Sequence, residues 1–153
     1  MRTGILAGAA AGAAGTAALN AVTYLDMALR GRASSKTPEQ TVEAIEEHLP
    51  VSVPGDGETR EHRVAGLGSL TGLVTGVGIG TAFGLLRRAG VRPPAPFNAL
   101  LIGATTMAAT DLSMAALDVT DPCTWSAADW LSDVLPHLAF GVVTDAVLRS
   151  LDR

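Results

Sequence analysis

The apolar positions of this chain are gathered into four long blocks, separated by segments that are rich in charged residues, proline or glycine. A helix needs about 20 mostly apolar residues to cross the hydrocarbon core of a bilayer. Four stretches reach that length, at residues 3–29, 64–87, 97–118 and 127–149. The pattern predicts an all-α protein, a bundle of four transmembrane helices that forms a single integral membrane domain over residues 1–153, with a polar loop at residues 30–63.

The second block carries glycine at every fourth position and holds no charged residue between Val64 and Leu86. Glycine destabilises the interior of a soluble helix by about 1 kcal/mol relative to alanine. A repeated row is favoured where it lets helices approach closely in lipid, as in GxxxG packing. We therefore predict helix packing, and self-association or assembly with other membrane subunits, through two glycine rows: Gly68, Gly72, Gly76, Gly80 and Gly84, with Gly4, Gly8 and Gly12 in the first block.

The first block also has features of a signal peptide, because Arg2 precedes an apolar run of small residues. The apolar pattern continues to Leu29, however, and the row of small residues runs on through Thr16 and Asn20. A segment that is removed has no need of a packing face. We therefore interpret the first block as a retained membrane helix, with cleavage as the alternative.

The polar loop contains one predicted amphipathic helix. Thr37 is the expected N-cap, Pro38 suits the first helical position, and Gln40 completes a capping box. Its apolar edge consists of Val42, Ile45 and Leu49. This short helix is expected to lie on the membrane surface or to cover the bundle, and a solvated connector is the alternative.

Basic residues give the expected orientation. The turn between the second and third blocks contains Arg87, Arg88 and Arg92, whereas the turn at residues 119–128 has no Lys or Arg. By the positive-inside rule, both termini of a multi-pass protein of a bacterial cytoplasmic membrane would then face the cytoplasm. Five basic residues of the polar loop favour the opposite orientation. In the first orientation Trp125 and Trp130 lie at the outer interface.

A weak internal repeat relates the two halves of the chain. Gly12 and Asn20 of the first block align with Gly103 and Asp111 of the third, together with several alanines. In the second and fourth blocks, the matching positions are Gly80 with Gly141 and Arg88 with Arg149. The first and third blocks run in the same direction, so the repeat predicts a parallel duplication of a helical hairpin, with chance matching of Ala/Gly-rich sequence as the alternative.

The fourth block holds the most informative chemistry. Polar residues recur there at i+4 spacing, which places neighbours on adjoining turns of one helix face: Asp129, Asp133, His137, Gly141, Asp145 and Arg149. An ionisable side chain within a bilayer is costly and usually faces a partner or a wet cavity. The candidate pathway or ligand site therefore consists of Asp133, His137 and Asp145, with Asp111 and Asn20 from other blocks.

Three interpretations of this column compete. In the first, its side chains join helices by hydrogen bonds, and the protein is an accessory or assembly component. In the second, His137 titrates near neutral pH and the carboxylates relay protons or a small solute through a channel or transporter. In the third, Asp133 and His137 hold a metal or act in catalysis, although one histidine with one or two carboxylates is a poor ligand set.

Several other classes of function are disfavoured. Cys123 is the single cysteine, so an intramolecular disulfide and a four-cysteine metal site are excluded. The net charge is −4 and no basic stripe is interleaved with aromatic residues, which argues against nucleic-acid binding. Ser132 shows no triad spacing, and no phosphate-binding loop is present. We therefore predict no catalytic residue, no metal and no cofactor, and the lipid bilayer as a partner.

The last third of the chain resembles a known family. The run TDPCTW at residues 120–125, followed by DWLSDVLPHLAFG at residues 129–141 and then by Arg149, is similar to the C-terminal part of the YagU-like uncharacterised inner-membrane proteins of bacteria. The resemblance implies a small multi-span inner-membrane protein with a link to acid resistance. Trp125, Asp133 and His137 are the matching positions. The chain departs from that family in its shorter loops and its higher content of Ala and Gly.

Overall fold

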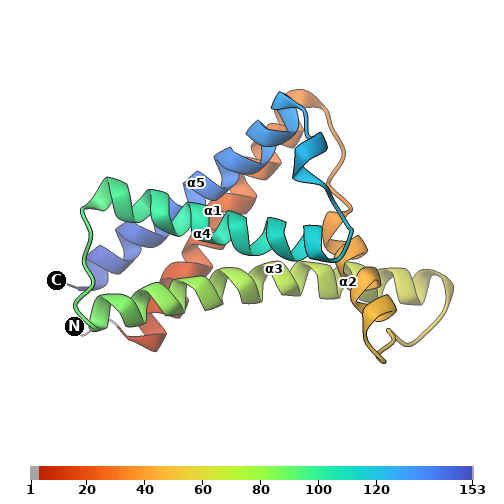
Figure 1. The fold of residues 1–153 in the computed structure, drawn as a ribbon, viewed down its shortest axis with the longest axis horizontal. Coiled ribbons are helices and arrows are strands. Elements are labelled where there is room, and N and C mark those ends of the chain that lie inside the picture. The colour runs from red at the N-terminus through yellow and green to blue at the C-terminus, as the bar shows by residue number, and fades with distance from the viewer. Residues whose placement is uncertain (1–3, 153) are drawn as a thin grey trace.

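The computed structural model describes residues 4–152, which form helices joined by loops (Figure 1). The helices in chain order are α1 (Ile5–Arg30), α2 (Thr37–His48), α3 (Gly57–Arg88), α4 (Ala95–Ala116), the short 3-10 helix η1 (Pro122–Thr124) and α5 (Ala127–Leu151). Four of them, α1, α3, α4 and α5, are long and apolar enough to cross a membrane. The predicted all-α architecture with four membrane-length helices is confirmed, and it fits a small multi-pass membrane protein.

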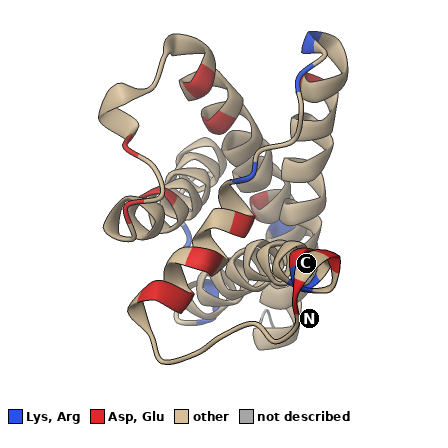
Figure 2. Ribbon diagram, turned by 90° about the vertical axis from the view of Figure 1, so that its right-hand side faces the viewer, with Lys and Arg blue, Asp and Glu red and all other residues tan. Residues whose placement is uncertain are grey.

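The long helices alternate in direction and give the bundle two distinct ends (Figure 1). Both ends of the chain and the turn between α3 and α4 lie together, and we name this the termini end. The opposite end carries the segment after α1, the connection between α4 and α5, and α2, and we name it the loop end. Charged positions gather on α2 and towards the helix ends, while long helical stretches carry none (Figure 2).

The ends of the predicted polar loop differ from expectation. Thr37 is the first residue of α2 and Lys36 occupies the N-cap position without a side-chain cap, so the predicted capping box is wrong. The Ser35 hydroxyl instead accepts a hydrogen bond from the Thr37 amide at 3.1 Å. α3 begins at Gly57 rather than near residue 64, because its polar first turns have a partner: Arg60 forms an ion pair with Glu46 of α2.

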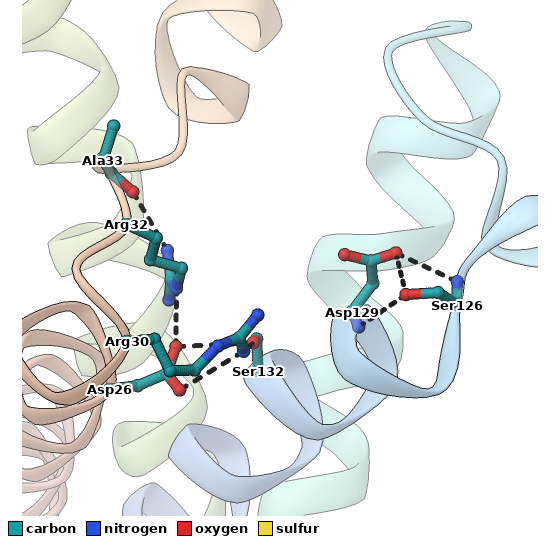
Figure 3. Close-up of polar contacts among 7 residues, drawn as sticks. All are labelled: Asp26, Arg30, Arg32, Ala33, Ser126, Asp129 and Ser132. Atoms are coloured by element: carbon teal, nitrogen blue, oxygen red, sulfur yellow. Dashed lines mark hydrogen bonds and ion pairs between the residues drawn. The ribbon is translucent and has the colours of Figure 1, made fainter.

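Local sequence accounts for two other boundaries. α1 ends at Gly31, which has a φ of 63° and so adopts the left-handed conformation that glycine accepts at a helix C-cap. α5 begins with a capping box in which the Ser126 hydroxyl accepts from the Asp129 amide and the Asp129 carboxylate accepts from the Ser126 amide (Figure 3). Asp129, the first acid of the predicted column, therefore serves as a helix cap.

Glycines hold α1 and α3 together with their backbones in contact. A Cβ added at Gly80 would lie 2.5 Å from the Gly12 nitrogen and 2.6 Å from the Gly8 carbonyl oxygen, and one at Gly84 would lie 2.8 Å from the Gly8 Cα. Gly76 meets the Thr16 side chain of α1. The predicted glycine rows of the first two blocks thus face each other within one chain.

Other members of these rows lie elsewhere. Gly68 packs against Pro38 of α2, where an added Cβ would come within 2.8 Å of the Pro38 carbonyl carbon. Gly72 and Gly4 have nothing within 4 Å of an added Cβ. The row on α3 therefore serves two different neighbours, and Gly72 packs against neither.

A second glycine crossing joins α4 and α5. A Cβ at Gly141 would lie 2.7 Å from the Gly103 nitrogen, and one at Gly103 would lie 2.7 Å from the His137 carbonyl oxygen. These are the glycines that the internal repeat aligns with Gly80 and Gly12. The repeat thus has a structural counterpart, since equivalent glycines form a crossing in each hairpin.

The two hairpins meet through α1 and α5. Phe140, Ile102, Leu148 and Ala11 form the buried apolar core at this junction. An added Cβ at Gly15 of α1 would come within 3.0 Å of the Phe140 ring. α3 and α4 share few contacts, and in Figure 1 the loop-end halves of α1 and α5 turn away from those of α3 and α4.

The crossings predict opposite effects for two alanine substitutions in the same glycine row. Gly80→Ala should destabilise the protein by about 1–3 kcal/mol, because the added methyl group meets backbone atoms that cannot rotate away. Gly72→Ala should be neutral or stabilise it by up to about 1 kcal/mol, because alanine favours a helix and the added methyl group meets open space. Unfolding of both variants in detergent micelles measures the difference, and equal stabilities would contradict the assigned crossing.

Candidate functional site

Two acids and the histidine of the predicted site come together between α4 and α5. The His137 Nδ1 lies 2.8 Å from the Asp133 carbonyl oxygen and 3.3 Å from its Oδ1 atom, one helical turn away. Asp111 of α4 lies within electrostatic range of both residues and is only 7% exposed. We call Asp111, Asp133 and His137 the Asp–His cluster.

Asp145 belongs to a different group, close to the termini end. Its carboxylate accepts hydrogen bonds of 2.6 Å from Asn98 Nδ2 of α4 and of 2.6 Å from Arg149 Nε. Arg149 also donates through Nη2 to the Pro93 carbonyl oxygen at 2.8 Å. These contacts, which we call the Asn98 network, satisfy a carboxylate that is only 3% exposed and tie the start of α4 to the end of α5.

The α4–α5 crossing separates the two groups. Gly141 lies between His137 and Asp145 on α5, and its missing side chain is replaced by the backbone of Gly103 and the carbonyl of Ala99. Backbone atoms of α4 therefore occupy the position that would connect the Asp–His cluster to the Asn98 network. The i+4 column of the sequence is not a continuous row of polar side chains in the structure.

Asn20 does not join either group. Its side chain lies on the exposed face of α1, and no hydrogen bond to it occurs among residues 4–152. Asp111, its counterpart in the internal repeat, is buried. The expected set of five pathway residues is therefore distributed over three places: the Asp–His cluster, the Asn98 network and the surface of α1.

The structure also reveals a polar group at the loop end that sequence analysis did not identify (Figure 3). Arg30 Nη1 donates to Asp26 Oδ1 at 3.3 Å and to the Ser132 hydroxyl of α5 at 2.6 Å. Arg32 forms a second ion pair with Asp26. The i,i+4 spacing of Asp26 and Arg30 was a usable signal, whereas the partnership with Ser132 depends on the packing of α1 against α5.

The remaining candidate residues, Trp125 and Cys123, lie in the connection between α4 and α5. Trp125 donates through Nε1 to the Thr120 hydroxyl at 2.9 Å and packs edge-on against Trp130, with ring centroids 5.0 Å apart. Cys123 is exposed. Within the described part of the chain, no three His, Cys, Asp or Glu residues are grouped so that they could hold a metal ion.

The Asn98 network predicts an energetic coupling between α4 and α5. Asn98→Ala and Asp145→Ala should each destabilise the protein, and their combination should cost less than the sum, with a coupling energy of about 1 kcal/mol. Asn20→Ala is the matched control, because its amide is exposed and unbonded, and it should change stability by less than about 0.5 kcal/mol. Unfolding in detergent micelles provides the four values of the cycle. Strict additivity would refute the pairing.

Comparisons with family models, curated proteins and solved structures found no match to this chain. The polar groups and the glycine crossing between them are therefore the features from which a function can be inferred.

Proposed function

We propose that this protein is an accessory or assembly component of a bacterial cytoplasmic membrane. The observation that carries the proposal is the α4–α5 crossing, which divides the titratable residues of α5 into two groups. Asp145 bonds Asn98 of α4, and Asp133 contacts His137 within α5, although the Asp133 Oδ2 atom has no hydrogen-bond partner among the described residues. Side chains that bond one another and the backbone join helices. A conducting path instead requires polar side chains that converge on a wet cavity.

The second candidate, a proton or small-solute channel or transporter, has less support. Asn20 lies on the surface of α1, and Gly141 packs against Gly103 where the path would continue. Asp145 already accepts hydrogen bonds from Asn98 and Arg149. What favours this candidate is the Asp–His cluster, which places a histidine beside two carboxylates near the middle of α5.

The surface of the bundle suits a protein with lipid and protein neighbours in a membrane. Large aliphatic side chains are exposed on all four long helices, among them Leu6, Val74, Leu112 and Val142. The glycine rows are largely occupied by contacts within the chain. Contact with other subunits, or with a second copy, would therefore use these aliphatic faces rather than the glycines.

The location and orientation rest on two further points. Arg88 and Arg92 are exposed at the termini end, which supports a cytoplasmic location of both termini by the positive-inside rule, whereas the five basic residues of the polar loop favour the opposite orientation. The resemblance of residues 120–141 to the YagU-like proteins supports a bacterial inner membrane as the location.

Flux measurements separate the two candidates. Liposomes that contain the purified protein, loaded with a pH-sensitive dye, should show no proton flux above that of protein-free liposomes after a pH jump, because the crossing interrupts the column. The His137→Ala variant should behave in the same way. Flux through the wild type that His137→Ala abolishes would establish the pathway and refute the assembly role as the sole function.

An assembly role has its own measurable outcome. The protein extracted from its membrane in a mild detergent should migrate in native electrophoresis as part of a complex larger than one chain, and His137→Ala should leave that complex intact. The Asp–His cluster lies inside the bundle, so its removal leaves the exposed aliphatic faces unchanged. Migration as a single chain in every mild detergent tried would contradict the proposal.

A further inference from the structure

The turn between α3 and α4, at the termini end, folds back tightly on the last turn of α3 (Figure 1). Gly90 has a φ of 95°, and its amide donates to the Arg87 carbonyl oxygen at 3.2 Å. The Val91 amide donates to the Leu86 carbonyl oxygen at 3.0 Å. This pair of bonds is the Schellman motif that ends a helix at a left-handed glycine. The chain therefore reverses direction as soon as α3 ends.

Two arginines on either side of this turn converge on one carboxylate of α5's C-cap. Arg87 Nε donates to the Asp152 Oδ2 atom at 2.8 Å, and Arg92 Nη2 lies 3.3 Å from the same oxygen. Arg87 is buried, and its Nη1 atom has no hydrogen-bond partner among the described residues. One carboxylate neutralises one guanidinium, so this contact between two arginines and one aspartate leaves a positive charge in excess.

The other charged residues of the termini end add to this excess. Arg149 is paired with Asp145 in the Asn98 network. Arg88 is exposed, and it forms no hydrogen bond or ion pair within residues 4–152. Four arginines and two aspartates thus lie in the described part of this end, which leaves two positive charges without an acid of their own.

The exposed arginines lie next to exposed apolar side chains. Arg88 is the last residue of α3, a helix of membrane-spanning length, so its guanidinium lies near the level of the lipid headgroups. Leu85 is 42% exposed and precedes Arg88 by three positions, which places it on the same face of α3, one turn further into the span. Phe97, in the first turn of α4, is 60% exposed. Unpaired cations at the end of apolar helices fit the phosphate and the acyl chains of a phospholipid.

We propose that the termini end binds one anionic phospholipid. The lipid phosphate accepts charge-assisted hydrogen bonds from Arg88 and from Arg92, whose side chain is 58% exposed, and an acyl chain lies against Leu85. The excess of positive charge favours a headgroup with a net negative charge over a zwitterionic one. The proposal goes beyond the proposed function and is independent of it, because a lipid site is compatible with an assembly component and with a transporter.

Native mass spectrometry of the full chain in a mild detergent tests the site. The protein is titrated with phosphatidylglycerol and, separately, with phosphatidylethanolamine of the same acyl chains. We expect one phosphatidylglycerol to be retained per chain in preference to phosphatidylethanolamine. Arg88→Ala should weaken phosphatidylglycerol retention about tenfold, because the phosphate loses a charged donor. Lys36→Ala, which removes an exposed positive charge at the loop end, is the matched control and should have no effect.

Two further measurements test the headgroup and the acyl chain separately. Combining Arg88→Ala with Arg92→Ala should abolish the preference between the two lipids, because two arginines then face two aspartates. Inorganic phosphate at the concentration of the lipid should not displace phosphatidylglycerol, because it has no acyl chain to cover Leu85. Circular dichroism of each variant verifies that the helices are retained. The Arg88 side chain has no partner in the described protein, so Arg88→Ala keeps the test valid if the double variant unfolds.

Four results would overturn the proposal. The first is equal retention of the two lipids by the wild type. The second is retention of phosphatidylglycerol by Arg88→Ala at the wild-type level. The third is equal loss of lipid in Arg88→Ala and Lys36→Ala, which would mean general attraction to basic side chains. The fourth is displacement of the lipid by inorganic phosphate at equal concentration, which would identify a site for free anions.

Discussion

The arrangement of this protein depends on two helix crossings in which backbone meets backbone. Gly8, Gly12 and Gly80 let α1 and α3 approach until no side chain fits between them, and Gly103 with Gly141 does the same for α4 and α5. Lipid chains are as apolar as leucine side chains, so helix association in a membrane relies on close packing rather than on the hydrophobic effect. Glycine supplies that packing at the expense of helix propensity. Each crossing holds its two helices together, whereas at the loop end α1 turns away from α3 and α5 turns away from α4 (Figure 1).

The same crossings decide what the polar residues can do. On α5, His137 and Asp145 are two turns apart, and Gly141 lies between them. The backbone of α4 fills the space beside Gly141 that a side chain would otherwise occupy. Each acid then finds partners on its own side: Asp145 bonds Asn98 and Arg149, and Asp133 lies beside His137. Buried charges need such partners because the bilayer interior offers them no water. The hydrogen bond between Asn98 and Asp145 holds α4 against α5, whereas the contact of Asp133 with His137 lies within α5. The bond between the two helices is the basis of the proposed assembly role.

The two ends of the bundle differ in how closely their helices pack. Near the termini end the helices are close and their polar residues are shared between them, as in the Asn98 network. At the loop end α1 and α5 leave a pocket with leucine walls, at which the paired charges of Asp26 and Arg30 lie. The divergence of the helices thus creates a surface that the tightly packed half cannot offer.

Local sequence was sufficient for the class of fold and for the number of membrane-length helices, because both depend on runs of apolar residues that need no knowledge of distant contacts. It was insufficient at the polar ends. The start of α3 at Gly57 depends on the ion pair between Arg60 and Glu46, and the cap of α2 depends on which hydroxyl reaches the Thr37 amide. Asn98 was missed because its importance comes from Asp145, which is remote in sequence.

The sequence by itself determined that the chain forms four apolar helices, that the first two carry glycine rows and that titratable residues share one face of the last helix, since helical periodicity follows from spacing along the chain. Only the tertiary structure decided which rows meet. Gly72 has no neighbour and Asn20 is exposed in the structure, although both belong to i+4 rows in the sequence. Gly103 of α4 packs against Gly141 and so interrupts the row of polar residues on α5. The physical reason is that spacing defines a helix face, whereas the neighbour of that face is set by the packing of all the helices together.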